Sequence, residues 1–333
     1  MSKLVSLPND NVCALGRADI REDGIAFDWT NSGVLFRFRG TKAKFRFDVP
    51  ALNQRLFLHI IVDGQWTRAC VCEGSTEIEA VALQEGEHKV HCVRITEVLD
   101  AVPLVIRDIT LEGEDPVLLS KPILPERRIE FIGDSITSGF GLLTDGLGQG
   151  YKTDEQDGAH TYAAQTAAYL MSQANFICIS GRGVVRNCDD IEAPLIPEFF
   201  KWTTVSNPTP WDYSQYQPDV VVVNAGTNDA DGDNPTSKEK FKAGVLDFLK
   251  ELRRVYPNAH IVWVYGMMNT LMDDVLTEAL KEFGDEKAIY VPMETAFDRS
   301  SELGACYHPN QRAHRRCAGV LIDVISDLTG WQR

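Results

Sequence analysis

Hydrophobic and polar residues alternate through much of the first 118 residues. Phenylalanines alternate with basic residues over 35–39 and 44–47, and this period of two is typical of β-strands that bury one face. Gly40 interrupts the pattern and predicts a turn, as does the polar stretch 84–88. Asp63 and Gly64 stand between two apolar runs and predict a tight hairpin. Several short strands without a helical pattern favour an antiparallel β-sandwich of the jelly-roll type over residues 1–118.

The pattern changes across residues 119–127, where Pro122 and Pro125 indicate a linker. Over residues 128–333, short continuous apolar runs alternate with segments whose apolar residues recur every three or four positions. The first kind is typical of parallel strands buried on both faces, and the second is typical of amphipathic helices. The sequence therefore predicts a three-layer α/β domain with a parallel sheet. Its expected strands contain the sequences IEFIG, FICIS, VVVVN, IVWVY and AIYVP.

Polar residues and glycines follow the expected strands directly, at the edge of the sheet where α/β domains bind ligands. Ser135 follows the first strand in the sequence GDS, and the helix that begins beside it offers backbone N–H groups to a developing negative charge. Ser and Asp are also common helix N-caps, so a purely structural role accounts for this segment as well. Gly181 and Gly183 follow the second strand, and Asn228 follows the third in the sequence GTND. These residues place a hydroxyl, backbone donors and an amide at one edge.

A histidine completes this set. His308 lies in a loop just before the last expected helix and is the histidine best placed to reach the sheet edge. The four groups follow one another in the chain order Ser, Gly, Asn, His. That order resembles the SGNH, or GDSL-type, hydrolases over residues 126–330. The resemblance implies that Ser135 is the nucleophile, that His308 is the general base, and that Ser135, Gly183 and Asn228 form the oxyanion hole.

The N-terminal region extends the resemblance. Residues 16–47 resemble the jelly-roll module of carbohydrate esterase family 2, and SGRGVVRN and WDYSQYQPDVVVVNAGTND resemble that family's second and third sequence blocks. The match covers nearly the whole chain. It implies an esterase that removes O-acetyl groups from plant polysaccharides or oligosaccharides, such as xylan, mannan or glucomannan. The implied chemistry passes through an acetyl-enzyme and needs no metal or organic cofactor.

One position departs from the common SGNH pattern, in which an Asp lies three residues before the histidine. Ala305 occupies that position here, and Cys306 follows it. Some family 2 esterases use a Ser-His dyad with a backbone carbonyl that orients the imidazole, so the resemblance implies a dyad in this chain. The alternative is that Asp298 or Glu302 folds back to become the third member of a triad.

The charge balance narrows the class of ligand. Asp and Glu number 48 against 33 Lys and Arg, and the resulting net charge of −15 disfavours nucleic acid and anionic membrane surfaces as partners. A neutral glycan is bound instead by aromatic faces and hydroxyl partners. Tyr307 is the expected stacking platform because family 2 members tend to place an aromatic residue beside the base. Trp211 is a second substrate-binding candidate.

Cysteine spacing and apolar segments bear on metal binding and location. The eight cysteines show no metal-binding spacing, so no metal site is predicted. The sequence has neither an apolar run long enough to span a bilayer nor a recognisable secretory signal. It therefore predicts a cytoplasmic protein, or a secreted one if a signal has been removed. The oligomeric state stays open.

Two other functions fit parts of the pattern. A GDSL lipase or thioesterase acting on longer acyl chains would use the same residues, together with an apolar tunnel for the chain. A non-catalytic glycan-binding protein would use the sandwich and retain the α/β domain as a relict. The intact GDS sequence and His308 argue against the relict.

Overall fold

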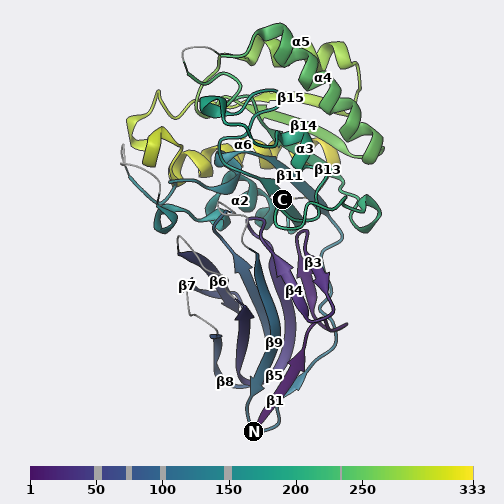
Figure 1. The fold of residues 1–333 in the computed structure, drawn as a ribbon, viewed down its shortest axis with the longest axis vertical. Coiled ribbons are helices and arrows are strands. Elements are labelled where there is room, and N and C mark those ends of the chain that lie inside the picture. Colours follow the sequence, from purple (N-terminus) through teal and green to yellow (C-terminus); the bar gives the residue numbers. More distant parts are fainter. Residues whose placement is uncertain (49–54, 73–76, 98–102, 146–151, 233–234, 333) are drawn as a thin grey trace. The chain divides into compact units, whose positions relative to one another are not determined.

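The structure, a computed structural model, describes residues 1–333 except 49–54, 73–76, 98–102, 146–151, 233–234 and 333 (Figure 1). Its internal contacts divide the chain into two units. The first contains Met1–Leu124 and Thr203–Thr209, and the second contains Pro125–Trp202 and Pro210–Arg333. The boundary between Leu124 and Pro125 falls inside the stretch that the sequence predicts to be a linker.

The first unit is built on an antiparallel sheet with the strand order β3-β4-β9-β5-β8-β6-β7; β1 pairs with β9, and β2 and β10 pair with β5. Large apolar side chains from the alternating strands fill its core, among them Phe36, Phe45 and Ile109. Antiparallel β-structure is therefore confirmed, while the jelly-roll arrangement stays a prediction. The strands are β1 Ser2–Ser6, β2 Cys13–Leu15, β3 Asp19–Arg21, β4 Gly24–Phe27, β5 Gly33–Asp48, β6 Leu56–Val62, β7 Gln65–Val71, β8 Glu77–Arg94, β9 Leu104–Glu112 and β10 Val117–Leu118.

The turns predicted at Gly40 and at residues 84–88 were wrong, because β5 and β8 run straight through them. Gly40 lies opposite Gly86 in the ladder, and the register shifts just after it. Gly40 has a φ of 147°, and an added Cβ would lie 2.4 Å from the Glu112 carbonyl oxygen. The glycine thus permits an irregularity inside a long strand. The hairpin at Asp63 and Gly64 is confirmed, since both residues have positive φ and join β6 to β7.

Thr203–Thr209 was predicted to belong to the α/β domain, yet it groups with the first unit. The Trp29 indole N–H donates to the Thr203 carbonyl oxygen at 2.9 Å. The buried Asp28 carboxylate accepts the backbone N–H groups of Val205 at 3.1 Å and Ser206 at 2.7 Å. These contacts join residues about 175 positions apart in the chain, a separation that local sequence pattern does not reveal.

The second unit contains a five-stranded parallel sheet with the order β12-β11-β13-β14-β15. The parallel sheet predicted from the apolar runs is confirmed. The strands are β11 Arg128–Gly133, β12 Gln173–Cys178, β13 Val220–Asn224, β14 His260–Tyr265 and β15 Ala288–Pro292. The α-helices are α1 Ser135–Ser138, α2 Tyr162–Tyr169, α3 Ile196–Phe199, α4 Lys238–Val255, α5 Asp273–Phe283 and α6 Gln311–Thr329. The 3-10 turns are η1 Thr153–Glu155, η2 Gly158–His160, η3 Cys188–Asp190, η4 Tyr213–Gln215, η5 Ser300–Glu302 and η6 Ala305–Tyr307.

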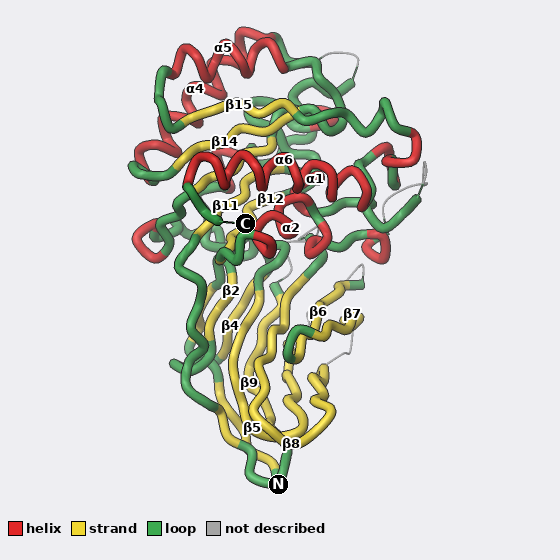
Figure 2. Tube along the Cα trace, turned by 180° about the vertical axis from the view of Figure 1, so that it is seen from behind, coloured by secondary structure: helices red, strands yellow, loops and turns green. Residues whose placement is uncertain are grey.

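Helices cover both faces of this sheet. α2 and α6 lie side by side on one face (Figure 2). Their residues Ala163 and Leu321 share a core with Val262 of β14. On the other face, Phe248 of α4 packs edge-on against Trp263 of β14. Adjacent residues of β14 therefore face opposite layers, as a strand's period of two requires. Among the helices that the structure describes, none is long and apolar enough to cross a bilayer.

The strand order positions the site. β11 lies between β12 and β13, so the connections that leave β11 and β12 cross the sheet in opposite directions. In such sheets the crevice beyond the carboxyl ends of the central strands is where ligands bind. The residues that follow β11, β12 and β13 therefore meet there.

Candidate active site

Ser135 lies at the start of the single-turn helix α1, directly after β11. Asp134 caps this helix, since its Oδ1 accepts the Ile136 backbone N–H at 3.0 Å. The cap holds the turn close to the end of the strand, and the Ser135 side chain is largely buried. The N-cap that the sequence suggested as a structural alternative is therefore present, and it is formed by Asp134 while Ser135 itself contacts another group.

That group is His308. The Nε2 atom of His308 lies 2.8 Å from the Ser135 Oγ, and its Nδ1 lies 3.0 Å from the Cys306 carbonyl oxygen. A carbonyl oxygen can only accept a hydrogen bond, so the Nδ1 atom carries the proton of the neutral ring. The Nε2 lone pair is then directed at the serine hydroxyl. The structure thus brings together the two residues that the sequence assigned as nucleophile and base, and fixes the tautomer that accepts the serine proton.

The loop before His308 has an unusual backbone. Cys306 and Tyr307 have φ values of 50° and 63°, in the left-handed region that residues other than glycine seldom adopt. The Gly304 N–H donates to the His308 carbonyl oxygen at 2.7 Å and closes the loop. This conformation turns the Cys306 carbonyl toward the imidazole.

Burial lowers the pKa of His308 to about 4, and the contacts with the backbone of Cys306 and Ala305 offset only part of that effect. The imidazole is therefore neutral near pH 7. The Phe140 ring also packs against it, with centroids 4.4 Å apart. A neutral, packed imidazole is the form that can accept a proton from a hydroxyl.

Asp298 and Glu302, the two carboxylates considered as the third member of a triad, do not hydrogen-bond to the His308 ring in the structure. Asp298 is exposed. Glu302 is buried and accepts a hydrogen bond from the Arg316 Nε at 3.1 Å. In the described part of the chain, the hydrogen-bond partners of the His308 ring are the Ser135 hydroxyl and the Cys306 carbonyl. The geometry therefore favours the dyad.

Asn228 and Gly183 lie on the loops that follow β13 and β12. The Asn228 Nδ2 donates to Asp134 Oδ2 at 3.1 Å and to the Arg182 carbonyl oxygen at 2.8 Å. The Gly183 N–H donates to Asn187 Oδ1 at 3.2 Å. Asn228 thus contacts both the nucleophile's cap and the residue before Gly183. The role of Ser135, Gly183 and Asn228 as oxyanion donors stays a prediction. Sequence reasoning missed Asn187, for which the only signal was its place in the block SGRGVVRN.

The two predicted sugar-binding aromatic residues differ in exposure. Tyr307 is 54% exposed, and its ring stacks on Phe297 with centroids 6.0 Å apart and an interplanar angle of 13°. Phe297 is itself 48% exposed and was not predicted. Trp211 is only 9% exposed, and its role in binding the substrate stays a prediction.

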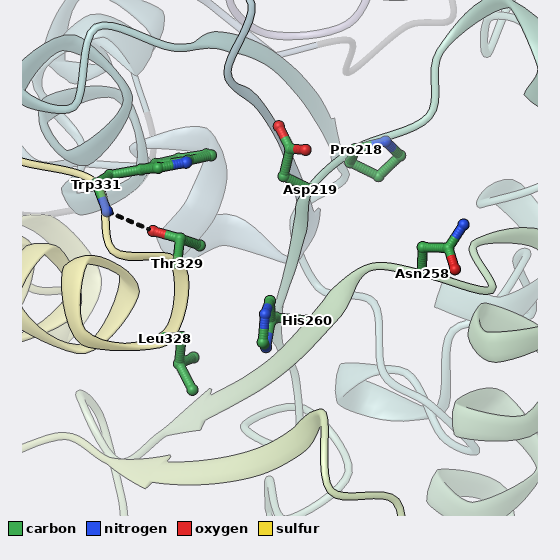
Figure 3. Close-up of a pocket in the computed structure, with 7 residues that line it drawn as sticks. All are labelled: Pro218, Asp219, Asn258, His260, Leu328, Thr329 and Trp331. Atoms are coloured by element: carbon green, nitrogen blue, oxygen red, sulfur yellow. Dashed lines mark hydrogen bonds between the residues drawn. The ribbon is translucent and has the colours of Figure 1, made fainter.

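A separate pocket lies at the opposite edge of the sheet, where β13 and β14 begin (Figure 3). It has a volume of about 260 Å³, and none of the predicted site residues contributes to it. Figure 3 shows Trp331 and Thr329 on one side and Asn258 on the other, with His260 between them. Among the described residues, no group of three or more His, Cys, Asp or Glu is arranged to hold a metal ion.

Comparison with known proteins assigns the family. Residues 131–316 match the GDSL-like lipase/acylhydrolase family, and residues 14–120 match the N-terminal domain of carbohydrate esterase 2. A family two carbohydrate esterase from Clostridium thermocellum, solved in complex with cellohexaose, has a similar structure with a TM-score of 0.90. It is 30% identical over 96% of this chain and 100% of that one. The chain belongs to carbohydrate esterase family 2.

Two curated proteins related to this family 2 member have names that describe an activity. The cellulase/esterase CelE of Acetivibrio thermocellus is 31% identical over 97% of this chain and 40% of its own length. An acetylxylan esterase/glucomannan deacetylase of Cellvibrio japonicus is 25% identical over 86% of this chain and 76% of its own length. The chain thus spans less than half of CelE and most of the other relative. The family inferred from the sequence is confirmed, as is an antiparallel β-region followed by an α/β domain with a parallel sheet.

Proposed function

We propose that this family 2 member is a serine esterase that removes O-acetyl groups from plant polysaccharides or oligosaccharides, such as xylan, mannan or glucomannan. The observation that carries the proposal is the hydrogen-bonded pair of Ser135 and His308, with the imidazole held by a backbone carbonyl. The names of the curated relatives support an acetylated glycan as the substrate.

Acylation begins at the serine hydroxyl. His308 Nε2 takes the proton from Ser135 Oγ as this oxygen bonds to the acetyl carbonyl carbon. The bond between that carbon and the sugar oxygen then breaks, and the proton on Nε2 passes to the departing sugar oxygen, which leaves as a hydroxyl. The Cys306 carbonyl accepts the Nδ1–H throughout, so it steadies the imidazolium that forms between the two transfers. Water repeats the sequence on the acetyl-enzyme and releases acetate.

The acetyl carbonyl oxygen becomes negatively charged when Ser135 attacks, and hydrogen-bond donors must stabilise that charge. The Ser135 backbone N–H, the Gly183 N–H and the Asn228 amide surround the end of β11 and supply them. The Gly183 and Asn228 groups donate to protein acceptors in the resting site, and the oxyanion takes over these donors as it forms. Such donors are most effective when the surrounding fold fixes them before reaction.

The sugar would bind beside the base. Tyr307 follows Cys306 directly and exposes one ring face, while Phe297 supports the other. A flat, exposed aromatic surface suits the apolar face of a pyranose ring. We expect the glycan chain to lie over Tyr307 while its acetyl group enters toward Ser135.

Acetate release from acetylated xylan, mannan, glucomannan and their short oligosaccharides tests the proposal, with S135A as the inactive control. We expect release by the wild-type protein only. A cytoplasmic location, still a prediction, favours the short oligosaccharides as substrates. No release from any acetylated glycan would contradict the proposal.

The alternatives predict other results. A comparison of p-nitrophenyl acetate with p-nitrophenyl octanoate separates an acetylesterase from a lipase or thioesterase, which would prefer the octanoate. A serine-directed phosphonate should label Ser135 irreversibly, whereas a non-catalytic glycan-binding protein would not react.

A further inference from the structure

The residue that follows Asn228 holds the loop that follows β12. Asp229 is fully buried, and its carboxylate accepts three consecutive backbone N–H groups. The donor distances are 2.9 Å from Val184, 2.8 Å from Val185 and 3.0 Å from Arg186. These residues follow Gly183 directly. A side chain on one loop of the site therefore fixes the backbone of the other.

A carboxylate is the group suited to this position. Its two oxygens can accept all three N–H groups, whereas an amide would present one oxygen and turn its NH₂ group toward a backbone donor. Burial raises the pKa of Asp229, and the backbone N–H groups of Val185, Val184 and Arg186 act in the opposite direction. A buried carboxylate is costly unless it is fully hydrogen-bonded, so the three donors are what make the buried position tolerable.

The contacts close tightly around Gly183. An added Cβ at this glycine would lie 1.9 Å from the Arg186 carbonyl oxygen and 2.7 Å from Asp229 Oδ2. On the other side, the Asn228 amide holds the Arg182 carbonyl oxygen at 2.8 Å. Arg182 and Val184, on either side of Gly183, are thus both hydrogen-bonded by side chains of the loop after β13. The direction of the Gly183 N–H follows from this arrangement.

We propose that Asp229 is a positioning residue for the oxyanion site. It contacts neither substrate nor reacting atoms; it holds the loop after β12 so that the Gly183 N–H points where the carbonyl oxygen acquires charge. The inference rests on the proposed esterase function. It adds a residue whose effect on the rate is transmitted through backbone geometry.

The variant D229N tests the inference by kinetics on p-nitrophenyl acetate. Misdirecting one oxyanion donor should lower kcat by about 10² to 10³, the scale seen when one such donor is removed. KM should stay within a few-fold, since ground-state binding does not use the donor. The acid limb of the pH profile should stay in place, because His308 is untouched. A general collapse of the site would move KM and the acid limb as well.

The control is Asp28, a carboxylate in the first unit that accepts backbone N–H groups in the same way. Asp28 is also fully buried and accepts the backbone N–H groups of Val205 and Ser206. Burial likewise raises its pKa. D28N should lower the melting temperature as D229N does, but leave the kcat of the folded protein unchanged. A D229N protein that is folded and within threefold of the wild-type kcat would overturn the inference.

Amide hydrogen exchange on the wild-type protein covers the case in which D229N does not fold. The amides of Val184, Val185 and Arg186 should exchange as slowly as those in the core of α4. Exchange at the rate of an exposed loop would overturn the inference without any variant. An inactive wild-type protein with slow exchange would instead count against the esterase proposal, so the two failures are distinguishable.

Discussion

His308 reacts only in its neutral form, and the structure keeps it neutral by burial rather than by pairing it with a carboxylate. A buried carboxylate partner would raise the pKa of the imidazole, as happens in triads. Here the partner is the uncharged Cys306 carbonyl, and the pKa is lowered to about 4. His308 is therefore deprotonated, and able to accept a proton, over a wide pH range. Its low pKa also makes it a weak base.

This arrangement sets the pH dependence of the reaction. A base acts when deprotonated, so activity should be present above the pKa of His308 and should fall as the pH drops through about 4. We expect kcat/KM on p-nitrophenyl acetate to be flat from about pH 8 to about pH 5. A half-maximum near 6.5, the ordinary value for histidine, would contradict the burial argument.

The dyad makes a prediction about the remaining carboxylates. D298N and E302Q should each leave kcat within a few-fold of the wild-type value, because neither side chain contacts the His308 ring. E302Q should lower the melting temperature, since it weakens the buried contact with Arg316. A loss of kcat on the order of 10⁴ in either variant is the result expected of a catalytic triad, and it would rule out the dyad.

Helix α6 begins three residues after His308, and it also holds the start of α2 by a hydrogen bond. The buried His314 of α6 accepts the backbone N–H of Tyr162, the first residue of α2, on its Nδ1 at 3.0 Å. The Tyr162 hydroxyl in turn lies 3.0 Å from Thr137 Oγ1 in the nucleophile's helix. His314 thus caps the start of α2.

Removing that cap should destabilise the protein without changing its chemistry. H314A leaves a buried N–H without an acceptor and should cost about 1 to 3 kcal/mol in the free energy of unfolding. H314N offers an oxygen acceptor and should cost less. Urea unfolding measures both, and kcat is the control. An unchanged stability of H314A would show that the N–H finds another acceptor.

The same histidine contributes to the pH dependence of stability. Burial lowers its pKa to about 3, so between about 6.5 and 3 the unfolded chain binds a proton that the folded chain does not. Its contribution to stability is therefore lost as the pH falls through that window. H314N should show a shallower fall than the wild-type protein between pH 7 and pH 5.

The elements differ in how far the sequence predicted them. The strands of the parallel sheet are continuous apolar runs that end in polar residues, so both their existence and their functional edge were predictable. Gly40 and Gly86 misled the prediction because a glycine signals a turn locally, whereas here the two lie opposite each other inside a long ladder. Asp229 was overlooked because its donors are backbone N–H groups, which every residue type carries.

At the scale of the whole molecule, sequence pattern predicted the two kinds of architecture and their order along the chain. It could not predict that Thr203–Thr209 joins the first unit. That grouping depends on Trp29 and Asp28, whose hydrogen bonds reach across more than half the chain. Such long-range pairings leave no local periodicity.

The net charge of −15 makes a prediction for the whole molecule. A neutral acetylated sugar is not steered by the protein's field, so salt should have little effect on its capture. We expect kcat/KM on an acetylated xylo-oligosaccharide to change by less than about twofold between low salt and about 0.5 M NaCl. A steep dependence on salt would indicate a charged substrate.

The left-handed pair formed by Cys306 and Tyr307 has a consequence for how the site can vary. The acceptor for His308 is a peptide oxygen, which any amino acid at position 306 supplies equally. Mutation can therefore remove this contact only by changing the path of the backbone, and alanine scanning will pass over it. Substitutions at position 306 are therefore limited by tolerance of the left-handed conformation rather than by the chemistry of the side chain.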